Sequence, residues 1–168
     1  MEKQHKQNLI KKCKNIKLVI TDVDGVLTDG GMYYSSKGES LKKFNTRDSM
    51  GMELLRQINI QTILMTRENS IIVKKRALKM KVDLYMKIKN KKEYLPIICK
   101  KYKIKANNIA YIGDDVNDIE IMKSIGFSGA PNDAVDEIKS ISNYVCKLKG
   151  GQGAFREFAN FIYYSNLK

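Results

Sequence analysis

Two short acidic segments contain the side chains of this sequence that are best suited to catalysis. Asp22-Val23-Asp24-Gly25 follows one apolar, β-branched run, and Gly113-Asp114-Asp115, with Asp118 nearby, follows another. Two aspartates spaced i and i+2, where a strand turns into a loop, can divide the work between a nucleophile and a proton carrier. The same pattern also forms ordinary turns, so the second acidic segment is what favours a catalytic interpretation.

These carboxylates would repel one another if they met at one edge of a sheet, and a hard divalent cation would relieve the repulsion. We therefore expect Mg²⁺ as the cofactor. A calcium-binding EF-hand is excluded because its sixth and twelfth positions, normally glycine and glutamate, are Leu27 and Tyr33. The only histidine, His5, lies in the polar N-terminal segment, which leaves a Ser-His-Asp or Cys-His mechanism without a base.

The elements expected to position these groups alternate between strands and helices. Strands are predicted at residues 16–21, 61–65, 82–85 and 108–112, and helices at 48–58, 70–81, 91–103 and 118–124. Residues 32–34 and 41–44 flank a turn-rich segment and predict an inserted β-hairpin. The pattern indicates an α/β fold, a Rossmann-like three-layer parallel sheet with that hairpin and no separate cap domain. Ligands of such sheets bind beyond the carboxyl ends of the strands, where Asp22, Asp24, Thr66, Asp114 and Asp115 are expected.

Length and composition predict one domain. The 168 residues, 43% of them apolar, suffice for one ordinary core, and no stretch approaches the ~20 apolar residues that span a bilayer. We expect residues 1–15 to form a polar tail and residues 16–168 a single domain in a cytoplasmic protein. Cys13, Cys99 and Cys146 are odd in number and widely spaced, which indicates reduced thiols rather than a disulfide framework or a zinc site.

The net charge of +13 raises the hypothesis of nucleic-acid binding. The lysines, however, are spread over the whole chain, and arginine, the better reader of phosphates and bases, occurs only five times. A solvated basic surface is therefore favoured, with neither nucleic acid nor membrane as a partner. A positive field would still help to draw an anionic small molecule towards a cleft.

The order of the motifs resembles that of haloacid dehalogenase-type phosphatases. Residues 22–30, Thr66, Lys91 and residues 113–118 are similar to the four motifs of that family, and the resemblance covers residues 16–158. Residues 42–49 and 149–157 are similar to a small capless branch that acts on phosphorylated 3-deoxy-2-keto sugar acids. A catalytically silent module that keeps the fold and only oligomerises is the alternative from another class.

The resemblance implies a mechanism and a set of site residues. Asp22 would attack phosphorus and Asp24 would exchange the proton, while Thr66 and Lys91 would bind the phosphoryl oxygens. Mg²⁺ would be held by Asp22, the Asp24 carbonyl and Asp114, and Asp115 and Asp118 would provide one water-mediated contact and one supporting partner. The branch also implies a homotetramer built by the hairpin, including Tyr33-Tyr34, in which the glycine-rich segment Gly150–Gly153 of a neighbour helps to close each site. A flexible turn before a last helix is the alternative for these glycines.

The segment after Thr66 bears on which sugar acid is the substrate. In the resembling branch, octulosonate phosphatases usually continue Thr-Gly-Arg, and nonulosonate phosphatases Thr-Gly-Glu with an arginine and a lysine on the next helix. Here the chain reads Thr66-Arg67-Glu68, and Arg76 and Lys79 follow on one helix face. This favours a nonulosonate (KDN or N-acylneuraminate) 9-phosphate of sialic acid-type biosynthesis. 3-Deoxy-D-manno-octulosonate 8-phosphate, of lipopolysaccharide or surface-carbohydrate biosynthesis, is the alternative.

The substrate-binding residues expected on the same grounds are spread over four segments. One departure from the pattern is Arg67, which replaces the usual glycine and puts a bulky cation beside the phosphoryl-binding threonine. The run that contains Arg76 and Lys79 also fits an ordinary solvated helix face. The expected set is Asn45, Thr46, Asp48, Arg67, Glu68, Arg76, Lys79, Gly151 and Gly153.

Overall fold

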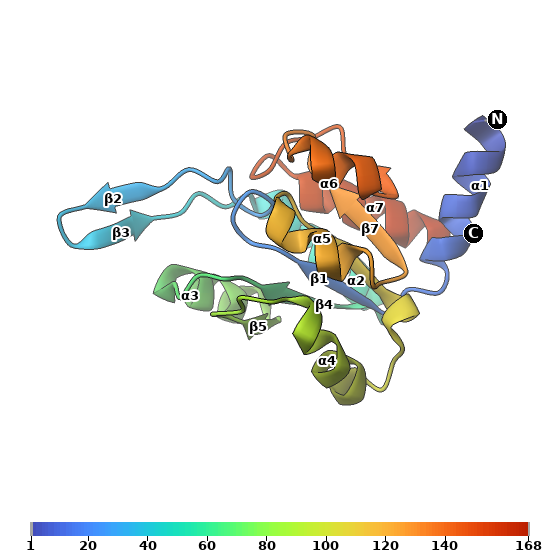
Figure 1. Ribbon diagram of the computed structural model, residues 1–168, viewed down its shortest axis with the longest axis horizontal. Helices are drawn as coiled ribbons and strands as arrows, with labels where there is room; N and C mark the ends of the chain where they lie inside the picture. Colours follow the sequence, from blue (N-terminus) through green and yellow to red (C-terminus); the bar gives the residue numbers. More distant parts are fainter. Residues whose placement is uncertain (1, 168) are drawn as a thin grey trace.

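A six-stranded parallel sheet runs through the computed structural model, which describes residues 2–167 (Figure 1). Its strand order is β5-β4-β1-β6-β7-β8. The strands are β1 (Leu18–Thr21), β4 (Gln61–Met65), β5 (Asp83–Tyr85), β6 (Ile109–Ile112), β7 (Phe127–Ala130) and β8 (Tyr144–Val145). The α/β parallel-sheet prediction is thus confirmed, and β1, which precedes the first acidic segment, lies between β4 and β6.

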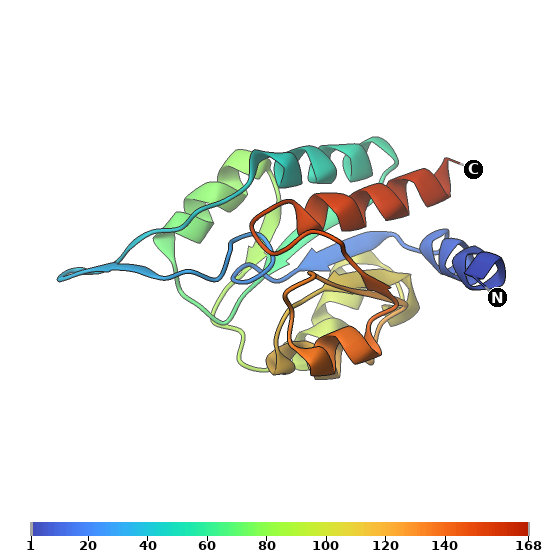
Figure 2. The ribbon, with the colours of Figure 1, turned by 90° about the horizontal axis from the view of Figure 1, so that it is seen from above.

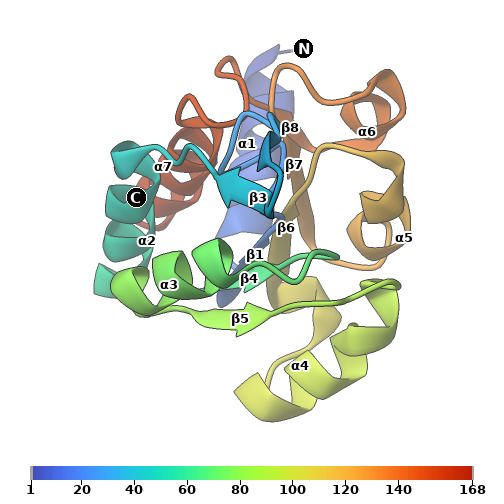
Figure 3. The same cartoon turned by 90° about the vertical axis from the view of Figure 1, so that its left-hand side faces the viewer.

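Helices cover both faces of the sheet, as Figure 3 shows. The first face carries α2 (Thr46–Gln57), α3 (Ile71–Met80) and α7 (Ala154–Asn166), and the second carries α4 (Leu95–Tyr102), α5 (Ile119–Met122) and α6 (Asp136–Ile141). Alternate residues of each strand enter the two cores. In β1, Val19 packs into the first core, whereas Leu18 and Ile20 pack into the second. Burial on both faces explains why the strand reads as a continuous apolar run.

The N-terminal segment, for which a polar tail was expected, forms helix α1 (Glu2–Cys13). Cys13, at its end, is fully buried in the first core, and its carbonyl accepts a hydrogen bond from the Asn166 side chain at 3.2 Å. Burial also raises the pKa of the Cys13 thiol to about 12. All three cysteines are free. The last residues of α7 therefore hold the end of α1 in place.

The inserted hairpin projects from the body of the molecule (Figures 1 and 2). Its strands β2 (Tyr33–Ser35) and β3 (Gly38–Leu41) pair antiparallel, as predicted. A bridge between Thr28 and Phe44 closes its base beside the first acidic segment. Met32, Tyr34 and Leu41 are each more than 60% exposed in the single chain. These apolar side chains make the hairpin an unusual surface for an isolated molecule.

Several elements differ from the sequence prediction. The helix expected at residues 91–103 is divided into a 3₁₀ turn, η1 (Lys92–Tyr94), and α4, because Pro96 occupies the first turn of α4. Strands β7 and β8 and helix α6 were not predicted. Two further 3₁₀ turns are η2 (Ala106–Asn108) and η3 (Val116–Asp118). Within residues 2–167, no helix is both long and apolar enough to cross a membrane.

Candidate active site

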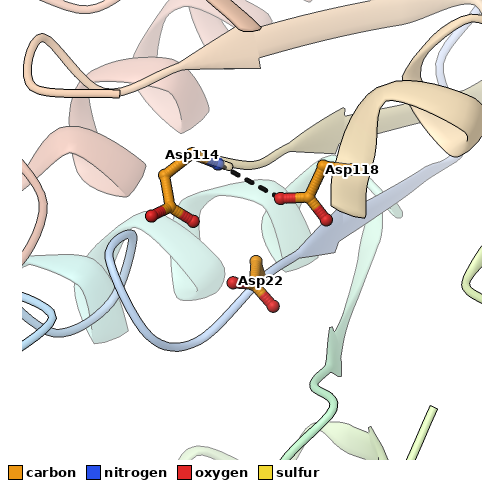
Figure 4. Close-up of side chains that lie close together, drawn as sticks. All are labelled: Asp22, Asp114 and Asp118. Atoms are coloured by element: carbon orange, nitrogen blue, oxygen red, sulfur yellow. Dashed lines mark hydrogen bonds between the residues drawn. The ribbon is translucent and has the colours of Figure 1, made fainter. Parts of the chain in front are cut away.

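The two acidic segments meet because their strands are neighbours in the sheet. Thr21, the last residue of β1, lies opposite Ile112, the last residue of β6. The Asp22 N–H continues this pairing by donating to the Ile112 carbonyl at 3.0 Å. Asp22, Asp114 and Asp118 consequently each place a carboxylate oxygen within 4.8 Å of the others, and Figure 4 shows the three side chains converging.

A buried lysine ties this cluster together. The Lys91 side chain is 1% exposed, and its Nζ lies 2.7 Å from Asp22 Oδ1, 2.5 Å from Asp118 Oδ1 and 2.8 Å from the Tyr111 hydroxyl. The Tyr111 hydroxyl donates to Asp118 Oδ1 at 2.7 Å, and the Asp114 N–H donates to Asp118 Oδ2 at 3.1 Å (Figure 4). Both oxygens of Asp118 are therefore engaged, which suits a residue that fixes Lys91 and the Asp114 loop.

The charges of the cluster are not balanced by protein groups alone. Burial, followed by the neighbouring carboxylates, raises the pKa of Asp114 to about 8. Burial also raises the pKa of Asp22 to about 7, although the Lys91 charge acts in the opposite direction. Burial opposes the charge of Lys91, but Asp22 and Asp118 raise its pKa, so this side chain stays a cation. The cluster contains three carboxyl groups and one lysine, so a further cation would be stabilised there. Carboxylate oxygens are the ligands that Mg²⁺ prefers.

Close packing brings Asp114 onto the first acidic loop. Gly25 has φ +87°, and a Cβ at this position would lie 1.9 Å from Asp114 Oδ2. A side chain at residue 25 would therefore occupy the position of the carboxylate. Asp115, by contrast, is exposed and caps η3 by accepting a hydrogen bond from the Val116 N–H at 2.7 Å.

Asp24 is held by groups that come from outside the cluster. Its Oδ1 accepts hydrogen bonds from Lys42 Nζ at 2.6 Å and from Thr28 Oγ1 at 3.3 Å. Its Oδ2 is buried and has no hydrogen-bond partner among residues 2–167. Asp24 therefore has one oxygen held by protein donors and one oxygen without a partner in the described part of the chain.

Thr66 follows the carboxyl end of β4, the other neighbour of β1. The residue is buried, and its Oγ1 accepts a hydrogen bond from the Glu68 N–H at 3.1 Å. Arg67 and Glu68 come directly after it and are exposed. The predicted phosphoryl-binding threonine therefore lies at the same sheet edge as Asp22, followed by two charged side chains that face solvent.

Four of the expected substrate-binding residues form a junction between α2 and the start of α7. Asn45 caps α2 through the Arg47 N–H at 3.0 Å and donates to the Gly151 carbonyl at 3.3 Å. Asp48 is buried and accepts a hydrogen bond from the Arg156 N–H at 2.9 Å. Gly151 has φ +66°, and Gly153 with φ +102° is the residue before α7.

This junction also packs against the first acidic segment of the same chain and the residue that follows it. The Gly151 N–H donates to the Val26 carbonyl at 3.0 Å. A Cβ on Gly150 would lie 1.9 Å from the Gly25 carbonyl oxygen. The glycine-rich segment, expected to reach a neighbour's site, thus packs against the first acidic loop of its own chain.

The structure places Arg76 and Lys79 in the groove between α2 and α3. Arg76 donates to the Asn45 carbonyl at 3.3 Å and to Ser49 Oγ at 2.7 Å, and its guanidinium lies over the Phe44 ring. Lys79 is exposed and lines the same groove. Thr46, the first residue of α2, is exposed as well. The polar contacts of Arg76 are therefore with α2 and not with the carboxylate cluster.

Sequence reasoning missed two residues of the site, Tyr111 and Lys42. A tyrosine in a strand buried on both faces needs a partner for its hydroxyl, and this was an available signal for Tyr111. Lys42 belongs to the segment that resembles the sugar-acid branch, but no local pattern shows that its side chain reaches back to Asp24. Its 2% exposure becomes apparent only in the fold.

Comparisons with known proteins agree with this geometry. The family model of haloacid dehalogenase-like hydrolases matches residues 53–156. The 3-deoxy-D-manno-octulosonate 8-phosphate phosphatase KdsC of Haemophilus influenzae is 38% identical over 152 residues, which cover 90% of this chain and 84% of that protein.

Two solved structures share the fold over nearly the whole chain. A protein described as a HAD superfamily (subfamily III A) hydrolase of Legionella pneumophila has a TM-score of 0.95 at 30% identity, covering 99% of this chain and 93% of the other. The 3-deoxy-D-manno-octulosonate 8-phosphate phosphatase of Moraxella catarrhalis, solved with a magnesium ion, a phosphate ion and KDO, has a TM-score of 0.92 at 31% identity, covering 96% and 93%. The chain therefore belongs to the haloacid dehalogenase-like hydrolase family and is a phosphatase without a separate cap domain.

Proposed function

We propose that this phosphatase hydrolyses a phosphorylated 3-deoxy-2-keto sugar acid, with 3-deoxy-D-manno-octulosonate 8-phosphate as the favoured substrate. The observation that carries this proposal is the similarity to an octulosonate 8-phosphate phosphatase over 90% of the chain. The cluster of Asp22, Lys91 and Asp114 supplies the groups that such a reaction needs. The comparisons favour this eight-carbon substrate over the nine-carbon substrate that the sequence pattern favoured.

The first half of the proposed reaction transfers the phosphoryl group to Asp22. An Asp22 oxygen forms a bond to phosphorus while the bond between phosphorus and the sugar oxygen breaks. Asp24 gives its proton to the departing sugar oxygen, which leaves as a neutral hydroxyl. Thr66 and Lys91 stabilise the charge on the phosphoryl oxygens, because fixed donors act most strongly where charge develops.

The second half releases phosphate. Asp24, now a carboxylate, takes a proton from a water molecule as that water attacks the phosphorus of phospho-Asp22. The bond between Asp22 and phosphorus breaks, and the free carboxylate is restored. Asp24 is again protonated, so the site is ready for another turnover.

We infer that Asp22, Asp114 and the Asp24 carbonyl hold Mg²⁺. Burial raises the pKa of Asp22 to about 7 and that of Asp114 to about 8, and this supports the inference because a bound cation would stabilise carboxylates whose ionised forms burial disfavours. Bound Mg²⁺ would neutralise charge between the carboxylate of the nucleophile and the phosphoryl group. Asp118 holds Lys91 and the Asp114 N–H, which leaves it a supporting role.

The nucleophile is tested by Asp22→Asn. We expect loss of phosphatase activity by at least about 10³-fold, because an amide neither attacks phosphorus nor carries the charge. Asp136→Asn, at an exposed position of α6, removes one charge as a matched control and should keep wild-type turnover. Wild-type activity of Asp22→Asn with Mg²⁺ present would refute both the nucleophile and the mechanism.

A nonulosonate 9-phosphate is the second candidate substrate. Glu68 favours it, because this exposed carboxylate follows Thr66 directly and can accept hydrogen bonds from sugar hydroxyls or an acylamino group. A comparison of kcat/KM for the octulosonate 8-phosphate and for KDN or N-acylneuraminate 9-phosphate decides between them. A clear preference for the nine-carbon substrate would overturn the favoured proposal.

We further propose a homotetramer that the hairpins of neighbouring chains build by packing against one another. The exposed Met32, Tyr34 and Leu41 support this, because such apolar side chains are normally covered in an assembly. Tyr34→Asp should lower the mass measured by light scattering, whereas Lys37→Asp, at the polar tip, should not. An unchanged mass for Tyr34→Asp, or a monomeric wild type, would contradict the proposal.

A further inference from the structure

We propose that Lys42, at the base of the hairpin, is a positioning residue that fixes Asp24 so that its Oδ2 exchanges the proton with the substrate. This inference rests on the proposed function of Asp24 as general acid and base. It assigns separate roles to the two oxygens of one carboxylate.

The two oxygens of Asp24 have different surroundings. Lys42 Nζ at 2.6 Å and Thr28 Oγ1 at 3.3 Å both donate to Oδ1. Oδ2 is buried and has no partner among residues 2–167. A buried acceptor without a partner is unfavourable, and such atoms are rare in folded proteins. Use of Oδ2 in proton transfer, with Oδ1 as the anchor, accounts for this one.

Lys42 is itself held tightly. Its side chain is 2% exposed, and its Nζ also lies 2.7 Å from Glu39 Oε1. The other oxygen of Glu39 accepts a hydrogen bond from Ser70 Oγ at 2.7 Å. Because Glu39 belongs to β3 and Ser70 precedes α3, a chain of polar contacts runs from the hairpin to Asp24 on one side and to the body on the other.

A lysine side chain is flexible and does not normally fix the orientation of a partner. Here contacts with two carboxylates hold the Lys42 ammonium group in one position. The hairpin thereby provides Lys42 as a hydrogen-bond donor to Asp24, and this donor does not come from the edge of the sheet. The alternative role for Lys42 is direct binding of an anionic group of the substrate, since its third ammonium proton is left over.

The test uses two leaving groups of different basicity. A sugar alkoxide must be protonated as it leaves, whereas the p-nitrophenolate of p-nitrophenyl phosphate leaves without help from an acid. For Lys42→Met we expect kcat/KM to fall about 10–100-fold with the sugar-acid phosphate and less than about threefold with p-nitrophenyl phosphate. Lys42→Arg, which keeps donors to both carboxylates, should recover most of the loss.

Lys43→Met is the matched control. Lys43 is the next residue, its side chain is 63% exposed, and its contact with Asp29 is long at 3.4 Å. We expect wild-type kcat/KM on both substrates for this variant. Thermal unfolding of all variants reports whether the fold is retained.

Three outcomes for Lys42→Met would overturn the proposal. These are an equal loss on both substrates, a rise in KM with unchanged kcat, which indicates substrate binding, and no loss at all. If Lys42→Met does not fold, Glu39→Gln replaces it, because this change loosens Lys42 and should give a smaller loss with the same leaving-group contrast.

Failure of the proposed substrate gives a different result. In that case the wild type would not hydrolyse sugar-acid phosphates but would still hydrolyse another primary alkyl phosphate. The contrast between that alkyl phosphate and p-nitrophenyl phosphate then tests Lys42 in the same way.

Discussion

Replacement of Asp48 by asparagine should stabilise the protein, and more so at high pH. Burial raises the pKa of the Asp48 carboxyl to about 7 from 3.8, although the Arg156 N–H and the charges of Arg76 and Arg156 act in the opposite direction. Asp48 is 2% exposed, and its Oδ2 has no hydrogen-bond partner among residues 2–167. Folding therefore removes the Asp48 carboxylate from water without replacing all of its hydrogen bonds, and this destabilises the ionised form.

The magnitude follows from the difference between the two pKa values, which is about three units. At about 1.4 kcal/mol per unit, the ionised carboxylate lowers the free energy of unfolding by about 4 kcal/mol above pH 7. Because the native protein binds the extra proton, this penalty is absent well below pH 3.8 and grows as the pH rises through the window from 3.8 to about 7. At pH 5 it is about 1.6 kcal/mol.

Urea unfolding of wild type and Asp48→Asn at pH 5 and pH 8 measures this effect. Asparagine keeps the Oδ1 acceptor for the Arg156 N–H, so we expect its gain in unfolding free energy at pH 8 to exceed its gain at pH 5 by about 2–3 kcal/mol. Mg²⁺ is kept at one concentration throughout, so that the ionisation of Asp22 and Asp114 is the same in both proteins. The exposed Asp136→Asn should show no such pH dependence.

An equal gain at both pH values, or a loss at pH 8, would refute the reasoning. Either result would mean that Arg76 and Arg156 compensate the Asp48 charge more fully than burial penalises it. We also expect kcat/KM of Asp48→Asn to stay within about threefold of wild type, because the carboxyl contacts the backbone of α7. A large fall would instead support the substrate contact expected from the sequence.

Three further predictions concern the site itself. Lys91→Met should lower activity at least about 10³-fold and stability by about 3–5 kcal/mol in thermal or urea unfolding, because it leaves two buried carboxylates without their cation. A stable and active variant would contradict this. Gly151→Ala should lower kcat/KM about tenfold, because its Cβ would lie 2.5 Å from the Asp29 backbone nitrogen, in the loop that follows the first acidic segment. Gly38→Ala has a positive φ but no atom within 4 Å, so it is the control and should keep wild-type activity. Removal of Mg²⁺ should lower the melting temperature more at pH 9 than at pH 6. The pKa of Asp22 and that of Asp114 are raised to about 7 and about 8, so both are largely neutral at pH 6 and repel as carboxylates at pH 9. An equal effect of Mg²⁺ at both pH values would count against it.

The centre of the site was predictable because it depends on strand order alone. Asp22 and Asp114 each follow an apolar strand, and parallel strands end at the same edge. The hairpin was also predictable, since its turn residues lie between two short apolar runs. In these cases the position of each residue follows from the residues next to it in the sequence.

The remainder depends on contacts between segments far apart in the sequence. Lys42 reaches Asp24 only because the hairpin returns to the sheet edge, and Asp48 reaches Arg156 across more than a hundred residues. Helix α1 was missed because its composition is polar, although Cys13 at its end is buried by tertiary contacts. The short strands β7 and β8 are defined by pairing with their neighbours rather than by their own residues.

If the proposed tetramer forms, the projecting hairpin would link the association of subunits to the rate of turnover. Its base contains Lys42 and Glu39, and its outer part presents the apolar side chains proposed to pair with other copies. The contact of Lys42 with Asp24 forms within one chain, but under that assembly neighbouring copies would restrict the motion of the hairpin, and dilution would remove this restriction by mass action. Specific activity would then rise with enzyme concentration and level off once the subunits are associated.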